Sequence, residues 1–573
     1  MHRSSAFVLI GLLLASCATG DVDPEAPDTP VATPTASDTP EDTAASPTPG
    51  ELSGPPLRPR MVVTGPEEVV FDWSEDACDP ENIPDIAARA FRGADDQVRL
   101  LIGHWDNYAM VGPTLDEVTL DCTPLLTSDF DPDPAAFNDS EWLGSVATED
   151  GETVHAIIHN EYRGDTHGTA RPGQCPSGAR LTCLDTSFTL AVSRDGGVTF
   201  DHVTEPPGHL LSTLPRQFDD KGRPSGIRQP SNLVRGPDDA WYLFGNVSDY
   251  PDDPAAPFED QWTCLLRTTD LGDPAAWRYW DGDGFNGQVV DPYVTDVTAD
   301  EPRCAPVDDD LGNVMHESVV WVEPLERYVM LGIDLVGDDV SRWAIQTSFS
   351  TDLLSWSPPE PVMELAAYPG VADAETDVFH AYLSLLDPDS SDRSFSTSDD
   401  DAYVYVTRFN AGSSSLDRDL LRIPVAFEEV EVEAPSWTFE TDGDTEGWFA
   451  LNALAPLEAL DGALRTTVVG EDPYMAVTGL SADSSLWDTV VVTMAVDGGG
   501  STSAELFFTT STTPEGEDTR VDFPTVVRAD GELHTYEIPV GVNPYWADAI
   551  TGLRVDPARS GDRQVVIESI ELS

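Results

Sequence analysis

Positive charge is scarce in this sequence. Its 573 residues include 30 lysines and arginines against 104 aspartates and glutamates, and Lys221 is the only lysine. The formal net charge of −74 argues against nucleic acid and anionic surfaces as partners, because both repel an acidic protein. Charge of this size fits a protein that must stay soluble, or one from a salt-rich environment, and it does not indicate the fold.

Long apolar runs are missing after the first residues. Residues 6–14 are apolar, follow Arg3 and precede small residues, as in a secretory signal. The ending Leu14-Ala15-Ser16-Cys17 resembles the bacterial lipobox. We therefore expect a signal peptide over 1–17, a lipidated Cys17, and export to the cell envelope or cell surface with lipid as the only membrane anchor; the alternative is an ordinary signal peptide with an incidental cysteine.

Aromatic residues are absent between Phe7 and Phe71. Residues 18–59 are instead rich in threonine, proline, aspartate, alanine and serine. Such a segment cannot bury a core, so we expect a disordered linker that holds a folded body away from the membrane.

Cysteine is absent after Cys304. Without Cys17, six cysteines remain: Cys78, Cys122, Cys175, Cys183, Cys264 and Cys304. An even number in an exported chain predicts disulfides, although the sequence leaves the connectivity open. Sequence neighbours would pair in the order just given, and none of the six has the close Cys/His spacing of a zinc site.

A turn motif recurs through the first two thirds of the chain. Its clearest copy is Ser193-Arg194-Asp195-Gly196-Gly197-Val198-Thr199-Phe200, which follows an apolar run and has strong hairpin chemistry. Weaker copies lie at Asp116, Asp270, Asp352 and Asp417. Roughly regular spacing of this kind indicates a repeat architecture. We therefore predict an all-β fold with a five-bladed β-propeller over residues 60–428.

The full motif, Ser-x-Asp-x-Gly-x-Thr-aromatic, resembles the Asp-box of sialidases and related propellers. In those proteins it is a structural turn between the outer strands of a blade, so the resemblance implies no catalytic role for Asp195.

The innermost strand of each blade should begin with a polar residue at the axial funnel, where propellers bind ligands. Five runs fit this description, and they are 85–91, 141–148, 228–234, 316–322 and 380–386. The starts of these runs supply most of the candidate site residues.

Two of these starts carry a family resemblance. Ile83-Pro84-Asp85 and His316-Glu317-Ser318-Val319-Val320-Trp321 are similar to the first and fourth inner strands of five-bladed propellers of glycoside hydrolase family 43. The resemblance implies that Asp85 is a general base and Glu317 a general acid. The third strand departs from the pattern, because Gln229 stands where that family has an aspartate.

Other residues complete the candidate site. A glycosidase needs one carboxyl group that stays protonated and another that is ionised, one on each side of the sugar. Glu161, in the segment His159-Asn160-Glu161-Tyr162, is the rival acid. The substrate-binding candidates are Arg89, Arg228, His316, Asp377 and His380. No cofactor is expected for catalysis.

Residues 435–573 read as a second domain. Short alternating runs separated by turn residues predict an antiparallel β-sandwich. Its two ends resemble jelly-roll carbohydrate-binding modules, which implies a structural calcium ion held by Glu440 and Glu568. Candidate sugar-stacking residues are Trp448, Tyr474, Trp487, Tyr545 and Trp546, of which we expect at most two to be exposed.

Three functions remain open. The first is a surface-anchored glycosidase acting on an extracellular oligo- or polysaccharide. The second is a lipoprotein that binds glycan without catalysis, which the missing third aspartate favours. The third is a purely structural envelope protein.

Overall fold

The structure, a computed structural model, describes residues 57–573 apart from several short segments. The segments left out are 172, 179–182, 221–223, 250–260, 298–302, 309–310, 312–314, 337–338, 366–376, 412–415, 548 and 560. The expected signal peptide, Cys17 and the linker 18–59, apart from its last three residues, therefore lie outside the described residues. Among the described residues, no helix has the length and apolar character needed to span a bilayer.

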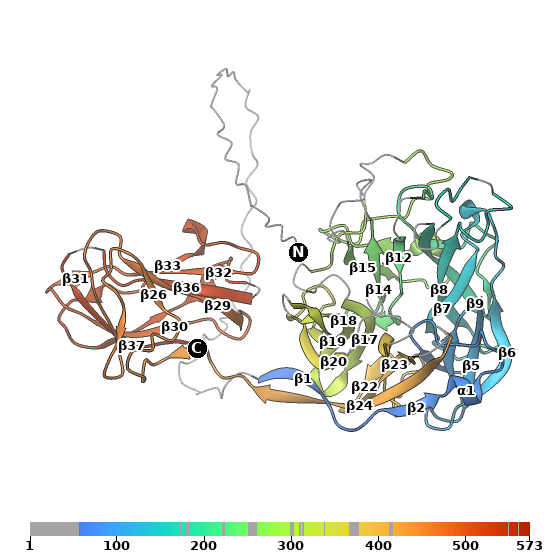
Figure 1. The fold of residues 1–573 in the computed structure, drawn as a ribbon, viewed down its shortest axis with the longest axis horizontal. Helices are drawn as coiled ribbons and strands as arrows, with labels where there is room; N and C mark the ends of the chain where they lie inside the picture. Colours follow the sequence, from blue (N-terminus) through green and yellow to red (C-terminus); the bar gives the residue numbers. More distant parts are fainter. Residues whose placement is uncertain are drawn as a thin grey trace, which may run out of the picture. The chain divides into compact units, whose positions relative to one another are not determined.

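The described chain is almost entirely β-structure, as predicted, and Figure 1 shows its strands in sequence colours. Its single α-helical turn is α1 (Trp73–Asp76). Residues 57–431 form four sheets, and residues 436–572 form a separate set.

The strands of the first region are grouped by sheet as follows. One sheet contains β3 (Arg89–Arg92), β4 (Val98–Gly103), β5 (Asp106–Gly112) and β6 (Thr119–Thr127). A larger sheet contains β7 (Ser140–Ala147), β8 (Val154–Arg163), β9 (Leu184–Ser193), β10 (Asp201–His202), β11 (Leu210–Ser212), β12 (Ser225–Arg228), β13 (Val234–Arg235), β14 (Trp241–Ser248), β15 (Gln261–Thr268) and β16 (Arg278–Tyr279). A third contains β17 (Met315–Val322), β18 (Arg327–Val336), β19 (Asp339–Ser350), β20 (Glu360–Leu365) and β22 (Thr397–Ser398). The fourth contains β1 (Leu57–Val63), β2 (Glu68–Phe71), β21 (Phe379–Leu386), β23 (Asp401–Phe409) and β24 (Arg418–Glu431).

These sheets pack face to face in a closed ring. Apolar clusters join the first sheet to the second (Phe91 with Leu143), the second to the third (Phe244 with Val319), the third to the fourth (Leu331 with Leu385), and the fourth back to the first (Leu420 with Leu100). A further cluster lies within the large sheet, between its β7–β9 half and its β12–β16 half. Sheets packed in a ring in this way form a β-propeller.

The ring is closed by the two ends of the propeller region. β1 lies antiparallel to β24 along its full length, from Leu57 opposite Glu431 to Val63 opposite Val425. The order β21–β23–β24–β1 therefore combines the last strands of the region with its first one.

The runs predicted at 141–148, 316–322 and 380–386 coincide closely with β7, β17 and β21, whereas β3 covers only the last part of the run 85–91, because the strand begins at Arg89. The third run, 228–234, is instead broken into the ends of β12 and β13. Pro230 explains the break, because proline cannot donate a ladder hydrogen bond and restricts the residue before it.

The aspartate turns mostly occupy equivalent places. Asp116, Asp195, Asp270 and Asp352 each precede the outermost strand of a sheet or half-sheet, namely β6, β10, β16 and β20. Asp417 does not, because it precedes β24, and the outermost strand of that sheet is β1. The fifth repeat is therefore completed by the N-terminal strand.

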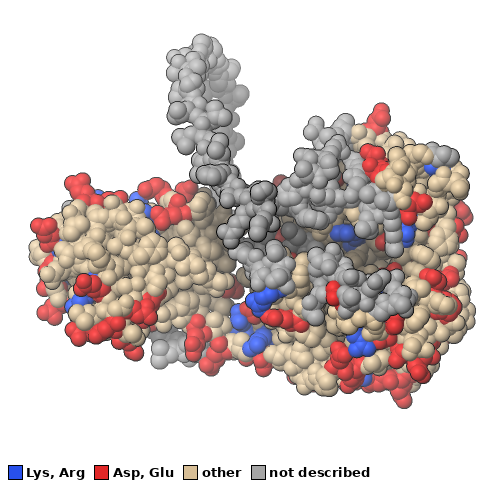
Figure 2. Space-filling model, viewed as in Figure 1, with Lys and Arg blue, Asp and Glu red and all other residues tan. Residues whose placement is uncertain are grey.

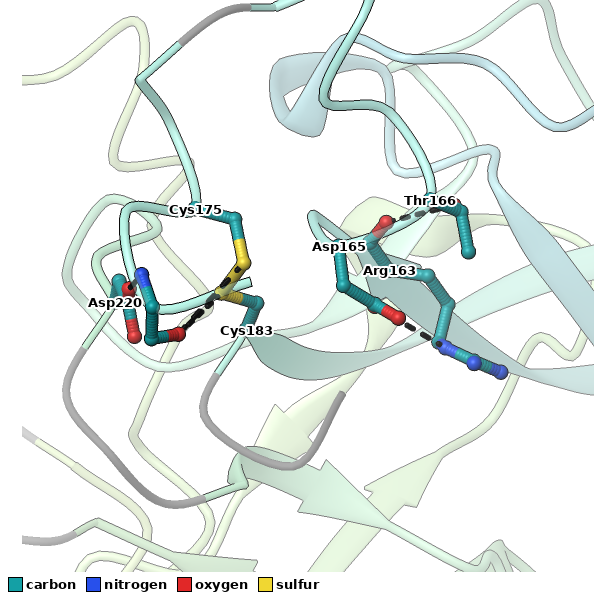
Figure 3. Close-up of a disulfide and its surroundings, with 7 residues drawn as sticks. Arg163, Asp165, Thr166, Cys175, Cys183 and Asp220 are labelled. Atoms are coloured by element: carbon teal, nitrogen blue, oxygen red, sulfur yellow. Dashed lines mark hydrogen bonds and ion pairs between the residues drawn. A yellow bond between two sulfur atoms is a disulfide. The ribbon is translucent and has the colours of Figure 1, made fainter. Parts of the chain in front are cut away.

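Three disulfides join sequence neighbours: Cys78–Cys122, Cys175–Cys183 and Cys264–Cys304. Figure 3 shows the second bond beside Asp220, whose carboxylate accepts from the backbone N–H of Ser177 at 2.9 Å. The same view shows Arg163 next to Asp165, with Nε 3.7 Å from Oδ1.

The C-terminal region contains two main antiparallel sheets. One is β25 (Ser436–Trp437), β27 (Glu458–Ala459), β28 (Leu464–Thr467), β30 (Val490–Val496), β35 (His534–Ile538) and β37 (Gln564–Leu572). The other is β26 (Phe449–Asn452), β29 (Tyr474–Asp483), β32 (Glu505–Thr510), β33 (Arg520–Asp522) and β36 (Ala549–Asp556), and a short pair joins β31 (Ser501–Thr502) to β34 (Val527–Arg528). Side chains from both main sheets share one apolar core, which makes the region a β-sandwich.

Acidic side chains dominate the charged surface of the described residues on the face drawn in Figure 2, as the composition requires.

Candidate active site

The innermost strands meet at the side chain of Arg89, on β3. Its Nε donates to the carbonyl oxygen of Gly144 on β7 at 3.0 Å. Its Nη2 donates to the carbonyls of Pro230 (2.9 Å) and Glu317 (2.7 Å), and its Nη1 donates to Leu383 (3.4 Å) and to the Ser384 hydroxyl. These acceptors use all five guanidinium donors. Arg89 is therefore a clamp between the sheets, with no donor left for the substrate role predicted from the sequence.

Irregular backbone on three neighbouring strands makes this clamp possible. The ladders shift register around Gly144 on β7, around His316–Glu317 on β17, and around Tyr382–Leu383 on β21. A bulge leaves a residue without its ladder partner and redirects its groups. At each of these places a carbonyl oxygen accepts a hydrogen bond from Arg89.

Asp85 lies just before β3 and is held from three directions. Its Oδ1 accepts from the Tyr382 hydroxyl at 3.1 Å and from Nη1 of Arg418, at the start of β24. Its Oδ2 lies 3.8 Å from Nε2 of His104. Burial lowers the pKa of His104, so this ring is held mainly as a neutral imidazole.

Glu317 lies on the other side of the same tyrosine segment. Its Oε2 accepts from the backbone N–H of Leu383 at 2.8 Å, the residue that follows Tyr382. Burial raises the pKa of Glu317 to about 7, against the opposing effects of the Leu383 hydrogen bond and the Arg89 charge. A substantial fraction of Glu317 is therefore protonated at neutral pH.

A very small pocket, with a cavity volume of about 10 Å³, lies beside Glu317 and Tyr382. It is lined by Ile86, Ala87, Arg89, Gln229, Pro230, Glu317 and Tyr382. Two of the lining residues, Gln229 (φ 50°) and Tyr382 (φ 65°), have left-handed backbone that is costly for a side chain with a Cβ. Strained backbone of this kind is concentrated at functional sites.

Glu161, the rival acid, also belongs to this neighbourhood. It lies on β8, where its Oε1 is 3.3 Å from Nε2 of His159. After burial and the charge of Asp85, the charge of Glu161 contributes to raising the pKa of Tyr382 well above its usual value. Tyr382 therefore contacts Asp85 and experiences the charge of Glu161, while Glu317 is contacted by the neighbouring Leu383.

Aromatic rings form a connected row beside these acids. His104 stacks on Trp105 with ring centroids 4.3 Å apart, and Trp142 lies 6.0 Å from His104 and 5.8 Å from His159. Phe130, which is 45% exposed, extends the row to the surface through Trp105. Trp142, His104 and His159 are buried, so only the half-buried Trp105 and the exposed Phe130 of this row could offer a face to a ligand.

The other predicted binding residues are more scattered. Arg228 ends β12 next to Gln229 of the pocket, and its Nη2 donates to Asn246 at 2.9 Å. His316 is buried in the β17 bulge beside Glu317. His380 on β21 lies opposite Arg408 of β23 in the strand ladder, and the charge of Glu67 acts on its ring. His380 therefore belongs to a different group of side chains from the one around Asp85 and Glu317. Asp377 is half-buried just before β21.

The aspartate turns are built from local hydrogen bonds. Asp195 Oδ1 accepts from the backbone N–H groups of Val198 (3.1 Å) and Thr199 (3.0 Å), and its Oδ2 accepts from the Thr199 hydroxyl (2.7 Å). Although burial opposes it, this set lowers the pKa of Asp195 to about 2. Asp352 repeats the pattern with Leu354 and Ser355.

In the sandwich, the predicted binding residues are mostly not placed for binding. Trp448, Trp487 and Trp546 lie in the apolar core, which rules them out as stacking platforms. Tyr545 is 44% exposed, and Tyr474 is half-buried with the Arg554 guanidinium 3.6 Å from its ring centroid. Glu440 and Glu568 are exposed, and among the described residues neither belongs to a group of three potential metal ligands.

Sequence reasoning missed Tyr382 and Arg418, the two donors to Asp85. Tyr382 was within a correctly predicted inner strand, but nothing in the pattern indicated a bulge with left-handed backbone there. Arg418 directly follows Asp417, and only the pairing of β24 with β23 brings it to the axis.

Comparisons with known proteins give fold-level likenesses only. No family model matches the sequence, and no curated protein matches it. A glycoside hydrolase family 43 arabinoxylan arabinofuranohydrolase from Bacillus subtilis is similar over 88% of this chain and 99% of its own, with 9% identity and a TM-score of 0.31. A sialidase from Trypanosoma rangeli is similar over 90% of this chain and 96% of its own, with 9% identity and a TM-score of 0.38. A family 29 carbohydrate-binding module, CBM29-2, covers 25% of this chain and 93% of its own, with 13% identity and a TM-score of 0.19.

Proposed function

We propose that the propeller is a glycoside hydrolase in which Glu317 donates a proton to the leaving oxygen while the Asp85 carboxylate takes a proton from the attacking water. The observation that carries the proposal is the pair Tyr382–Leu383. One residue donates its hydroxyl to Asp85 and the next donates its N–H to Glu317, so both acids are fixed by one turn of chain; Glu317 lines the small pocket, and Asp85 directly precedes its lining residue Ile86.

The environments of the two acids suit these different roles. Glu317 has a pKa of about 7 because it is buried, and a general acid works best when its pKa is near the working pH. Asp85 instead accepts from a charged guanidinium and from a phenol, which are partners for a carboxylate. Two carboxyl groups with opposed environments are the usual requirement for glycoside hydrolysis.

Glu317→Gln tests the proposal most directly. The amide keeps the shape but cannot donate the proton, so turnover of an unactivated oligosaccharide should fall by about 10²–10⁴-fold. A nitrophenyl glycoside should lose much less, because its leaving group needs little protonation. The substrate is first found by screening the purified chain against aryl glycosides and a polysaccharide panel.

Glu429→Gln is a matched control, since Glu429 is an exposed glutamate on β24. It should leave turnover unchanged on both substrates. An active wild-type enzyme whose Glu317→Gln variant keeps full turnover on both substrates would defeat the assignment, and Glu161→Gln would then be the next variant to measure.

A glycan-binding protein without catalysis is the second candidate. It is favoured by Gln229 in the position where an aspartate was expected, and by the complete use of the Arg89 donors inside the protein. In this case the wild type would bind a polysaccharide in calorimetry without turning it over. Trp105→Ala would weaken binding, and Glu317→Gln would leave it nearly unchanged.

The remaining architecture is part of the same proposal. We assign five blades to the propeller over 60–428 and a jelly-roll topology to the carbohydrate-binding-like domain over 435–573, with Glu440 and Glu568 as its calcium ligands. Lipidation of Cys17 would anchor the protein at the cell surface through the linker 18–59.

A further inference from the structure

A second group of ionisable side chains lies away from the Asp85–Glu317 pocket. Glu141 is the second residue of β7, His202 lies in β10, and His209 directly precedes β11. One ligand atom from each lies within 4.8 Å of the other two. Nε2 of His202 is 2.8 Å from Oε1 of Glu141, and the two imidazole rings have centroids 4.4 Å apart.

This group is buried at the end of an apolar core. Glu141 and His209 are both 0% exposed. The core beside them contains Leu143 and Ile158 from the large sheet and Phe91 from the first sheet. Charged or polar atoms in such a place are costly unless each has a partner.

Several of these atoms have no partner within the described part of the chain. Oε2 of Glu141 makes no hydrogen bond there, and His209 interacts with the backbone carbonyls of Phe137 and Pro207 without a hydrogen bond of normal geometry. An ion pair between Glu141 and His202 accounts for one contact only. This ion pair does not explain why the imidazole of His209 is buried against it.

A neighbouring pair shows what a simple ion pair looks like in this protein. His167 Nε2 lies 2.8 Å from Asp139 Oδ2, which also accepts from the backbone N–H of Arg163 at 2.7 Å. Among the described residues, this pair belongs to no group of three potential ligands. The extra histidine is what distinguishes the Glu141 group.

The other three-residue group is not a competitor. It consists of Cys175, Cys183 and Asp220, but the two cysteines are joined in a disulfide and cannot ligate a metal as thiolates.

We propose that Glu141, His202 and His209 form a binding site for a divalent transition metal of the Zn²⁺ type. Two imidazoles and one carboxylate are a ligand set that zinc prefers, with the fourth position filled by water. Bonds of about 2.0–2.2 Å place such ligands within about 4 Å of one another, so small side-chain rotations suffice here. The ion would tie the segment carrying His202 and His209 to β7.

The test uses the full chain without a histidine tag, stripped with a chelator and held in excess Ca²⁺, which occupies the acidic surface. Zn²⁺ titrated in a calorimeter should bind with one equivalent per chain and raise the unfolding temperature. Co²⁺ should produce the visible absorption of a tetrahedral site, and Zn²⁺ should abolish that absorption.

His209→Gln should weaken Zn²⁺ binding at least tenfold and remove the Co²⁺ absorption, whereas His167→Gln should leave both unchanged. Glu141→Gln provides a second variant in case His209→Gln fails to fold. A wild-type chain that takes up no stoichiometric Zn²⁺, or a folded His209→Gln protein with full affinity, would overturn the site. These readouts do not depend on glycan turnover.

Discussion

The centre of the propeller and the core of the sandwich are both buried, but their interiors differ in chemistry. The sandwich core is apolar, with Phe439, Trp448 and Phe508 among its least exposed residues. At the propeller centre the corresponding position is occupied by Arg89, with Glu317 beside it. The sandwich core is stabilised by apolar area removed from water, and the propeller centre by hydrogen bonds between buried donors and acceptors.

This difference indicates where function is to be expected. A buried guanidinium and a buried carboxyl group carry a desolvation cost that an apolar core avoids. The propeller bears that cost where the innermost strands meet and again at Glu141, which is 0% exposed, whereas the described residues of the sandwich bury one carboxylate, Asp556, and pair it with Arg554.

Arg89→Met should have the largest effect. Methionine fills similar volume but leaves the carbonyls of Gly144, Pro230, Glu317 and Leu383 without their donor. Breaking a buried charged network costs about 3–5 kcal/mol, so the propeller should unfold at much lower urea concentration. Intrinsic fluorescence and circular dichroism across a urea series measure this. Arg528→Met, at an exposed position in the sandwich, should change little, and equal losses from both variants would refute the clamp.

Gly197→Ala should destabilise by about 2–4 kcal/mol, because it combines strain with overpacking. Gly197 has φ +83°, and an added Cβ would lie 2.1 Å from the ring of Phe91. Gly499→Ala in the sandwich is the matched control, with φ +77° and no atom within 4 Å of the added Cβ. It should lose only the strain, about 1–2 kcal/mol. Thermal unfolding of both variants gives the difference, and a Gly499 loss as large as that of Gly197 would contradict the packing argument.

The pH dependence of stability should identify Glu317. Burial raises its pKa from 4.5 to about 7, so between these pH values the folded state keeps a proton that the unfolded state releases. The free energy of unfolding should therefore fall as pH rises through this window, by roughly 2–3 kcal/mol in total. Urea unfolding at pH 5, 6, 7 and 8 measures this fall, and the Glu317→Gln variant should lack it. If the free energy of unfolding falls equally with pH in the wild type and the variant, Glu317 is not the cause.

Asp195 should make the free energy of unfolding depend on pH in the opposite direction, since its pKa is lowered to about 2. Its contribution is present above pH 4 and is lost as pH falls from about 4 towards 2. Asp195→Asn should therefore flatten the acid limb of the stability profile and leave the Glu317 window unchanged.

The strands could be predicted from the sequence because their signals are local. Alternating apolar residues and turn chemistry predicted three of the five inner strands to within one residue at each end, and the first only in its last part. The same signals predicted a β-sandwich for the C-terminal region, where two antiparallel sheets share one core. The third inner strand was misjudged because the break at Pro230 was read as part of a continuous run.

The site was harder to predict because its contacts are not local. Arg89 was expected to bind substrate, yet its acceptors are carbonyls that bulges on distant strands turn toward it. The three sandwich tryptophans were read as stacking candidates because composition cannot distinguish an inward from an outward ring. The spacing of Glu141, His202 and His209 in the sequence did not indicate that they lie together in the fold.

The pairing of β1 with β24 also constrains how the chain is made. Leu57 is among the first residues of the propeller to be synthesised, and its partner Glu431 is among the last. Until β24 exists, β1 has no sheet to join, and until β21 exists, no Leu383 carbonyl is available to Arg89. Contacts between such distant segments form slowly, so the growing chain carries an unpaired edge for most of its synthesis. A chain that stops short of β24 therefore cannot close the ring, however well its earlier sheets have folded.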